Sequence, residues 1–189
     1  MISGFIIMAL PFISIISAIA YLPYALYITK RLGRQTFLYH IVRFVFIGYL
    51  MSLIYLTLLW YYPEITFQPE YYFLNLKPFI WVREVYDMGI KKMYEQLILN
   101  VGMFIPYGLL LPMAIKNARN FRTVSLIVLF STIGIETIQY FMGRSADIDD
   151  VIMNFFGGII GYLLFIIMNK LFENKGFWKG ITNNRMVSN

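Results

Sequence analysis

Hydrophobic residues in this chain gather into five long runs, separated by segments that hold most of the charged residues. A helix needs about 20 mainly apolar residues to cross the hydrocarbon core of a bilayer. Each run is long enough, so we predict one membrane-spanning helix from each. The runs cover Ile2 to Ile28, Ile41 to Tyr62, Leu97 to Ile115, Thr123 to Met142 and Val151 to Met168. The predicted fold is all-α, a polytopic membrane helix bundle of about five transmembrane helices.

The composition agrees with a membrane location. Hydrophobic residues make up 59% of the chain and charged residues 14%, against about 45–50% and about 25% in soluble domains. The chain has no cysteine, which excludes disulfides and thiolate metal ligands. Its net charge of +6 does not indicate a nucleic-acid partner, because basic residues of membrane proteins collect on the cytoplasmic side.

The distribution of charge predicts how the chain crosses the membrane. Most of the 16 basic residues follow the first and third runs or lie in the tail, and the positive-inside rule places these segments in the cytoplasm. Of the ten acidic residues, all but Glu173 then fall on the opposite side. We therefore predict the N-terminus outside and the C-terminus inside. The basic residues on the inner side are Lys30, Arg31, Arg34, Arg43, Lys116, Arg119, Arg122, Lys170, Lys175, Lys179 and Arg185.

The chain divides into three predicted parts. Residues 1–70 form an N-terminal transmembrane hairpin, residues 71–172 form a second membrane domain, and residues 173–189 form a basic cytoplasmic tail. We interpret the tail as a frayed end, as is typical of polar termini. The longest connection, Pro63 to Gln96, contains aromatic residues suited to the headgroup layer. A re-entrant or interfacial segment is expected there.

Polar residues interrupt the last three runs near their outward-facing ends. Glu136 and Gln139 are three residues apart, and Asp150 and Asn154 are four apart, so each pair shares one helix face. Asn100 lies near the start of its own run. Arg144 and Asp147 occupy the tight connection above. The candidate ligand-binding residues are Asn100, Glu136, Gln139, Arg144, Asp147, Asp150 and Asn154.

These polar groups have a structural and a functional interpretation. They can hold helices together, at roughly 0.6 kcal/mol per hydrogen-bonded pair in a membrane. Ionisable residues inside a membrane are usually functional, and Glu136 has Asp150 and Arg144 close in sequence. We therefore favour a functional site. Gly157 and Gly161 continue the face of Asp150 as a G-x-x-x-G pattern, which predicts close approach of a neighbouring helix.

Three stretches of the chain resemble the VanZ-like family of bacterial membrane proteins, which is named for an accessory protein associated with teicoplanin resistance. They are "NLKPF" at 75–79, "NVGMFIPYGLLLP" at 100–112 and "ETIQYFMGRSADIDDVIMNFFGGIIG" at 136–161. The third stretch is the most specific. It combines E-x-x-Q, an arginine and D-x-x-D-x-x-x-N before a glycine-rich helix. The resemblance implies a multi-pass protein of the bacterial cell membrane with a role in glycopeptide resistance or cell-envelope maintenance.

The sequence leaves three mechanisms to compare. The first is a binding protein in which Arg144 pairs with a phosphate or carboxylate of an anionic amphiphile at the extracytoplasmic face. Its partners would be membrane lipid and a lipid-linked cell-wall precursor or a lipoglycopeptide. The second is a membrane enzyme acting on such a precursor, with Glu136 as general base. The third, transport with Glu136 as a proton relay, is disfavoured because no inverted repeat is detectable.

The chemistry of the candidate site limits these mechanisms further. No cofactor and no nucleic acid are expected. Asp147 and Asp150 offer oxygen ligands to a divalent cation, but two carboxylates are a poor set for tight binding, so we do not predict a metal site. The sequence supports both a binding protein and an enzyme.

Overall fold

The computed structural model describes residues 9–59, 74–79 and 89–182. Five of its helices are long and apolar enough to cross a membrane. They are α2 (Leu10–Leu32), α3 (Phe37–Ile54) with its π-helical continuation η2 (Tyr55–Leu59), α5 (Ile90–Ala114), α6 (Phe121–Phe141) and α7 (Ile148–Phe172). The predicted all-α membrane bundle is confirmed.

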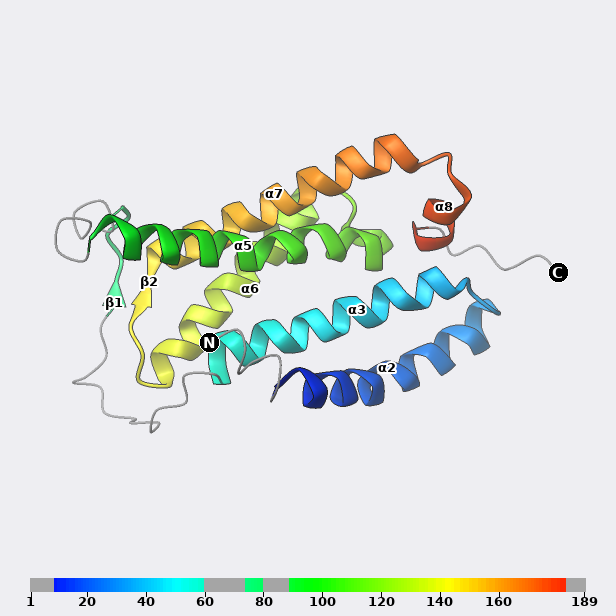
Figure 1. Ribbon diagram of the computed structural model, residues 1–189, viewed down its shortest axis with the longest axis horizontal. Coiled ribbons are helices and arrows are strands. Elements are labelled where there is room, and N and C mark those ends of the chain that lie inside the picture. The colour runs from blue at the N-terminus through cyan, green and yellow to red at the C-terminus, as the bar shows by residue number, and fades with distance from the viewer. Residues whose placement is uncertain (1–8, 60–73, 80–88, 183–189) are drawn as a thin grey trace.

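Successive long helices run in opposite directions, so the bundle has two distinct ends (Figure 1). At one end two short strands, β1 (Leu74–Asn75) and β2 (Ala146–Asp147), pair in parallel. At the other end lie the 3-10 turn η4 (Lys116–Ala118) and the short helix α8 (Gly176–Thr182). We call these the β end and the α8 end. Which end faces the cytoplasm remains a prediction.

Capping residues and basic side chains explain why the helices differ in length from the predicted runs. The helix α2 continues past Lys30 and Arg31 to Leu32, because long basic side chains can reach the headgroup layer from a terminal helical turn. The helix α3 begins at Phe37, since the Thr36 hydroxyl accepts a hydrogen bond from the Tyr39 amide at 3.2 Å. The hydrophobic pattern alone predicts neither the extension of α2 nor the N-cap of α3.

Two predicted segments fall partly outside the described residues. The first apolar run was placed from Ile2, whereas the description begins at residue 9. The expected re-entrant segment between Pro63 and Gln96 is described only at residues 74–79 and from Gly89 onward. Neither prediction is tested there.

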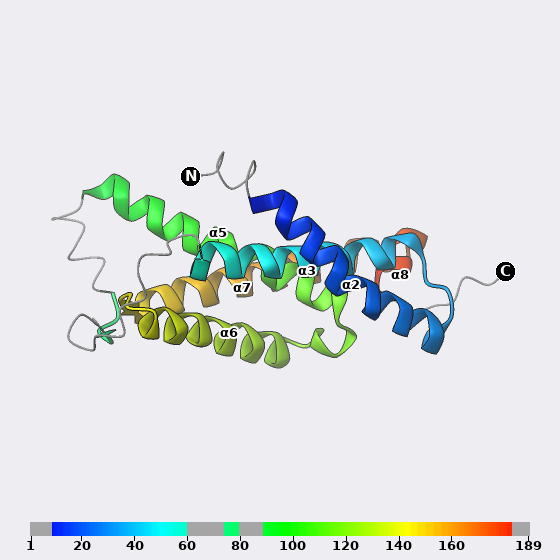
Figure 2. The same ribbon diagram turned by 90° about the horizontal axis from the view of Figure 1, so that it is seen from below.

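The helices α5 and α7 pack side by side through glycine (Figures 1 and 2). A Cβ atom placed on Gly161 would overlap the carbonyl oxygen of Ile105, and one on Gly157 would overlap that of Val101. Gly108 of α5 faces the carbonyl oxygen of Gly158 just as closely. The predicted close approach at Gly157 and Gly161 is confirmed.

The remaining long helices surround this pair. The helices α3 and α6 pack against it, whereas α2 packs mainly on α3 and lies at the edge of the bundle (Figure 1). In Figure 2, α6 lies along one edge of the bundle, and α2 crosses α3 obliquely. Apolar side chains such as Phe12 and Ile19 on α2 point outward, as expected of a surface in contact with lipid tails.

The interpretation of the tail as a frayed end is wrong for residues 176–182. These residues form α8, and the Trp178 side chain is only 1% exposed. Its indole Nε1 donates a hydrogen bond to the Asn169 Oδ1 atom on α7 at 2.8 Å. A buried aromatic side chain of this size stabilises the docked helix, and this outweighs the polar composition on which the sequence interpretation depended.

Candidate functional site

All seven predicted ligand-binding residues lie at the β end of the bundle. They come from three long helices and from the connection between α6 and α7. Two elements of the N-terminal half, η2 and β1, reach the same region (Figure 1). The site is therefore assembled from segments far apart in the sequence.

Asp147 links the connection to α6 and to β1. Its backbone amide donates to the Glu136 Oε2 atom at 3.1 Å, and the Glu136 side chain is only 6% exposed. The Asp147 carboxylate accepts from the Asn75 side-chain amide through both oxygens, each at 3.1 Å. It also caps α7 by accepting from the Asp149 amide at 2.8 Å, as expected of an aspartate at this position.

A second link joins α5 to α7. The Asn100 Nδ2 atom donates to the Asp150 Oδ1 atom at 2.5 Å. This short hydrogen bond ties the first turn of the apolar span of α5 (Leu97–Ala114) to the first turn of α7. The predicted convergence of Asn100 with the acidic residues is therefore observed.

Gln139 and Arg144 share one acceptor. The Gln139 Nε2 atom donates to the Thr57 carbonyl at 2.8 Å, and the Arg144 Nη1 atom donates to the same oxygen at 2.6 Å. Thr57 lies in the last turn of the second span, where carbonyl groups lack partners within the helix and the helix dipole is negative. The arginine is thereby held over a helix C-terminus.

Asn154 lies one helical turn deeper than Asp150. Its Nδ2 atom donates to the Thr132 hydroxyl of α6 at 3.3 Å, and its side chain is only 4% exposed. Its Oδ1 atom is buried and has no hydrogen-bond partner among the described residues. Helical side chains lean toward the N-terminus of their helix, so the carboxamide of Asn154 leans toward the turn that carries Asp150.

The charges of the cluster act on one another. Glu136 interacts electrostatically with Asp150, Arg144 and Asp147, and Asp150 interacts with Asp147, Arg144 and Asp149. Among the described residues the cluster thus contains more carboxylates than guanidinium groups. A polar ligand would gain most by bringing hydrogen-bond donors to these oxygens. Within the described ranges, no group of three carboxylate or imidazole side chains is arranged to hold a metal ion.

Sequence reasoning missed three participants. Asn75 contacts Asp147 from β1, although it lies in the "NLKPF" stretch already singled out. Asp149 is 6% exposed and accepts from the Phe79 amide at 2.6 Å, and its place among three aspartates was the available signal. Thr57 takes part through its backbone carbonyl, for which a sequence carries no signal.

Comparisons with known proteins place the chain in a family. A family model described as VanZ/LLP1 matches residues 44–169, which include all seven candidate residues. Protein VanZ from Enterococcus faecium is 35% identical over 130 residues, covering 67% of this chain and 74% of that protein. No solved structure matches this chain. The match of the family model and the similarity to Protein VanZ show that the chain belongs to the VanZ-like family of multi-pass membrane proteins.

Proposed function

We propose that this protein binds an amphiphilic cell-envelope molecule in the polar cluster at the β end, and that it thereby contributes to glycopeptide resistance or to envelope maintenance. Membership of the VanZ-like family and the similarity to Protein VanZ support a role in glycopeptide resistance or envelope maintenance. The chemistry of the polar cluster supports binding.

The unpartnered oxygen of Asn154 is the observation that carries this proposal. A buried polar atom without a partner costs free energy, roughly 1–3 kcal/mol in mutational data. The Asn154 Oδ1 atom is such an acceptor, and it lies beneath a group of carboxylates. An N–H or O–H group of a ligand would satisfy it.

The proposed ligand has three kinds of group. A phosphate or carboxylate pairs with Arg144 through parallel hydrogen bonds. Amide or hydroxyl donors meet the oxygens of Glu136, Asp150 and Asn154. An apolar chain lies against outward-facing side chains of α6 and α7 near the cluster, such as Phe141 and Phe156, which are 58% and 54% exposed. Lipid-linked cell-wall precursors and lipoglycopeptides such as teicoplanin carry all three groups.

The charge distribution favours binding on the outer side of the membrane. Basic residues dominate the α8 end, and the positive-inside rule assigns such an end to the cytoplasm. The β end then faces the outside of a bacterial cell membrane. Glycopeptides and their lipid-linked targets meet on that side.

Substitution of Arg144 tests the proposal. Arg144→Ala should abolish resistance to teicoplanin in cells that express the variant at the wild-type level. Arg144→Lys should be clearly defective, because an ammonium group cannot form the planar pair of hydrogen bonds. The measurements are the minimal inhibitory concentration and the retention of teicoplanin by the purified protein in native mass spectrometry.

Arg122→Ala is the matched control, since it removes an exposed arginine at the α8 end. It should retain wild-type resistance and binding. If both Arg144 variants also retain full resistance at equal expression, Arg144 is a structural charge and the anion-binding part of the proposal is wrong.

A further inference from the structure

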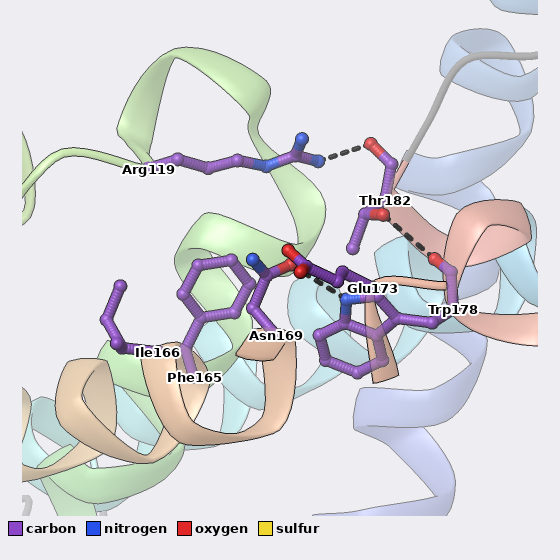
Figure 3. Close-up of a pocket in the computed structure, with 7 residues that line it drawn as sticks. All are labelled: Arg119, Phe165, Ile166, Asn169, Glu173, Trp178 and Thr182. Atoms are coloured by element: carbon purple, nitrogen blue, oxygen red, sulfur yellow. Dashed lines mark hydrogen bonds between the residues drawn. The ribbon is translucent and has the colours of Figure 1, made fainter. Parts of the chain in front are cut away.

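A cavity of about 300 Å³ opens at the α8 end, at the opposite end of the bundle from the polar cluster. Figure 3 shows its lining, which combines charged, polar and aromatic side chains from α7, α8 and the connection before α6. Arg119, Asn169 and Glu173 supply the polar groups, and Phe165, Ile166 and Trp178 supply apolar walls. This combination is typical of a site for an amphiphile.

Arg119 is half-buried beside this cavity. Its Nε atom donates to the Pro112 carbonyl at 3.1 Å, and its Nη2 atom donates to the Thr182 carbonyl at the end of α8 (Figure 3). Burial, and secondarily the charge of Arg43, lower the pKa of the Arg119 guanidinium below its ordinary value. The environment of Arg119 thus disfavours its positive charge.

Arg43 is a second buried cation, close enough to Arg119 to act on its charge. Its side chain is 4% exposed, and its Nη1 atom donates to the carbonyls of Tyr39 at 3.0 Å and Ile181 at 3.3 Å. The guanidinium carbon lies 3.3 Å from the centre of the Tyr39 ring. Its Nε atom is buried without a hydrogen-bond partner among the described residues.

The two arginines are therefore incompletely neutralised. Within the described ranges, their partners are carbonyl oxygens and one aromatic ring. Burial of a cation is costly unless a negative charge accompanies it. The exposed carboxylate of Glu173 lines the same cavity, so Arg43 and Arg119 together leave one positive charge in excess.

We propose that this cavity binds the head group of an anionic phospholipid, with the phosphodiester at Arg119. A phosphatidylglycerol-type head group carries one negative charge, which balances the excess. The Asn169 Oδ1 atom already accepts from Trp178, so the Nδ2 group of Asn169 supplies a second donor to the phosphate. A head-group hydroxyl donates to Glu173.

The surroundings of the cavity match the remaining parts of such a lipid. Phe165 and Trp178 cover the glycerol esters, and Ile166 continues onto an outward apolar surface that includes Leu171, which is 65% exposed. The cytoplasmic leaflet is the anionic one, and basic pockets between helices on that side suit lipid head groups. The predicted topology places the α8 end in that leaflet.

Native mass spectrometry of the full chain tests this site directly. The detergent-purified protein is mixed with phosphatidylglycerol or with phosphatidylcholine of the same acyl chains. We expect retention of phosphatidylglycerol to exceed that of phosphatidylcholine by about tenfold, which corresponds to about 1.4 kcal/mol. The choline group has no hydrogen-bond donor for Glu173, and its positive charge cancels that of the phosphate, so this lipid leaves the local excess of positive charge unbalanced.

Two substitutions with opposite expected effects separate binding from loss of folding. Arg119→Gln should abolish the preference for phosphatidylglycerol. Glu173→Gln should raise its retention, because the repulsion between carboxylate and phosphate is removed while an amide oxygen still accepts the hydroxyl. An unfolded or undocked α8 could not produce that increase. Lys175→Gln, which removes an exposed charge outside the cavity lining, should retain wild-type binding.

Three results would overturn the assignment. One is equal retention of the two lipids by the wild-type protein. Another is an equal loss in Arg119→Gln and Lys175→Gln, which would indicate general surface attraction. The third is binding of glycerol 3-phosphate as tight as that of the lipid, which would make the ligand a soluble phosphate ester.

Discussion

At the scale of single residues, Asp147 has three structural tasks at the β end. It caps α7, accepts from Asn75 and donates its amide to Glu136. Asp147→Ala would remove the cap and leave the Asn75 amide, whose side chain is 5% exposed, without its acceptor. We expect a loss of roughly 1–3 kcal/mol in the free energy of unfolding, measured as a lower melting temperature in detergent.

In this experiment Asp147→Asn is the conservative variant and Ser145→Ala is the control. Asparagine is also a good N-cap and keeps one acceptor oxygen. Asp147→Asn should therefore lower the free energy of unfolding less than Asp147→Ala. The exposed Ser145 should tolerate alanine within about 0.5 kcal/mol. Equal stability of Asp147→Ala and the wild-type protein would show that these hydrogen bonds do not hold the connection.

The sequence predicted the polar residues of the site through their depth and spacing on helices. Glu136, Asp150 and Asn154 could be placed at one end of the bundle because a helix has a fixed rise and period. Asn75 and the Thr57 carbonyl could not be placed there from the sequence. The partner of Asn75 is 72 residues away in the chain, and the partners of Thr57 are 82 or more residues away. Contacts of that kind depend on how helices pack, which periodicity does not specify.

At the scale of secondary-structure elements, the contact between α5 and α7 depends on glycine. A Cβ atom on Gly108 would overlap the Gly158 carbonyl oxygen, whereas one on Gly102 of the same helix would have no heavy atom within 4 Å. We expect Gly108→Ala to destabilise the protein by roughly 1–3 kcal/mol, as for other overpacked cores. Gly161→Leu should destabilise the protein more than Gly108→Ala, because the larger leucine side chain meets the backbone of α5.

Gly102→Ala is the matched control for this contact and should leave the melting temperature in detergent unchanged. If Gly108→Ala is as stable as Gly102→Ala, the two helices do not approach as closely as described. The glycine pattern was readable from the sequence because small residues at a spacing of four permit close packing. The pattern does not specify which helix packs against these glycines.

The helix α8 shows where reasoning about elements fails. Its basic and polar composition indicated a frayed end, yet the Thr36 hydroxyl donates to the Gly180 carbonyl at 2.7 Å, and Arg43 and Arg119 donate to the next two carbonyls. These three donors come from distant parts of the chain and satisfy the end of α8. A seven-residue helix is too short to form without such tertiary partners, so local propensity could not predict it.

At the scale of the whole molecule, the two ends of the bundle differ in charge. Carboxylates gather at the β end, whereas basic residues gather at the α8 end. The long helices between them expose apolar side chains outward. Both proposed ligands have a long apolar chain, so each would enter from the bilayer and meet the protein at one of these ends.

Both proposals depend on which end faces the cytoplasm, and single cysteines can establish this. The wild-type chain has no cysteine, so labelling starts without background. Ser145 at the β end and Asn117 at the α8 end are both exposed and lie outside the spans. Ser145→Cys should react with a membrane-impermeant maleimide in whole cells, and Asn117→Cys should react only after permeabilisation, because basic connections stay inside. The reverse pattern would place the polar cluster in the cytoplasm, where an extracellular glycopeptide could not reach Arg144.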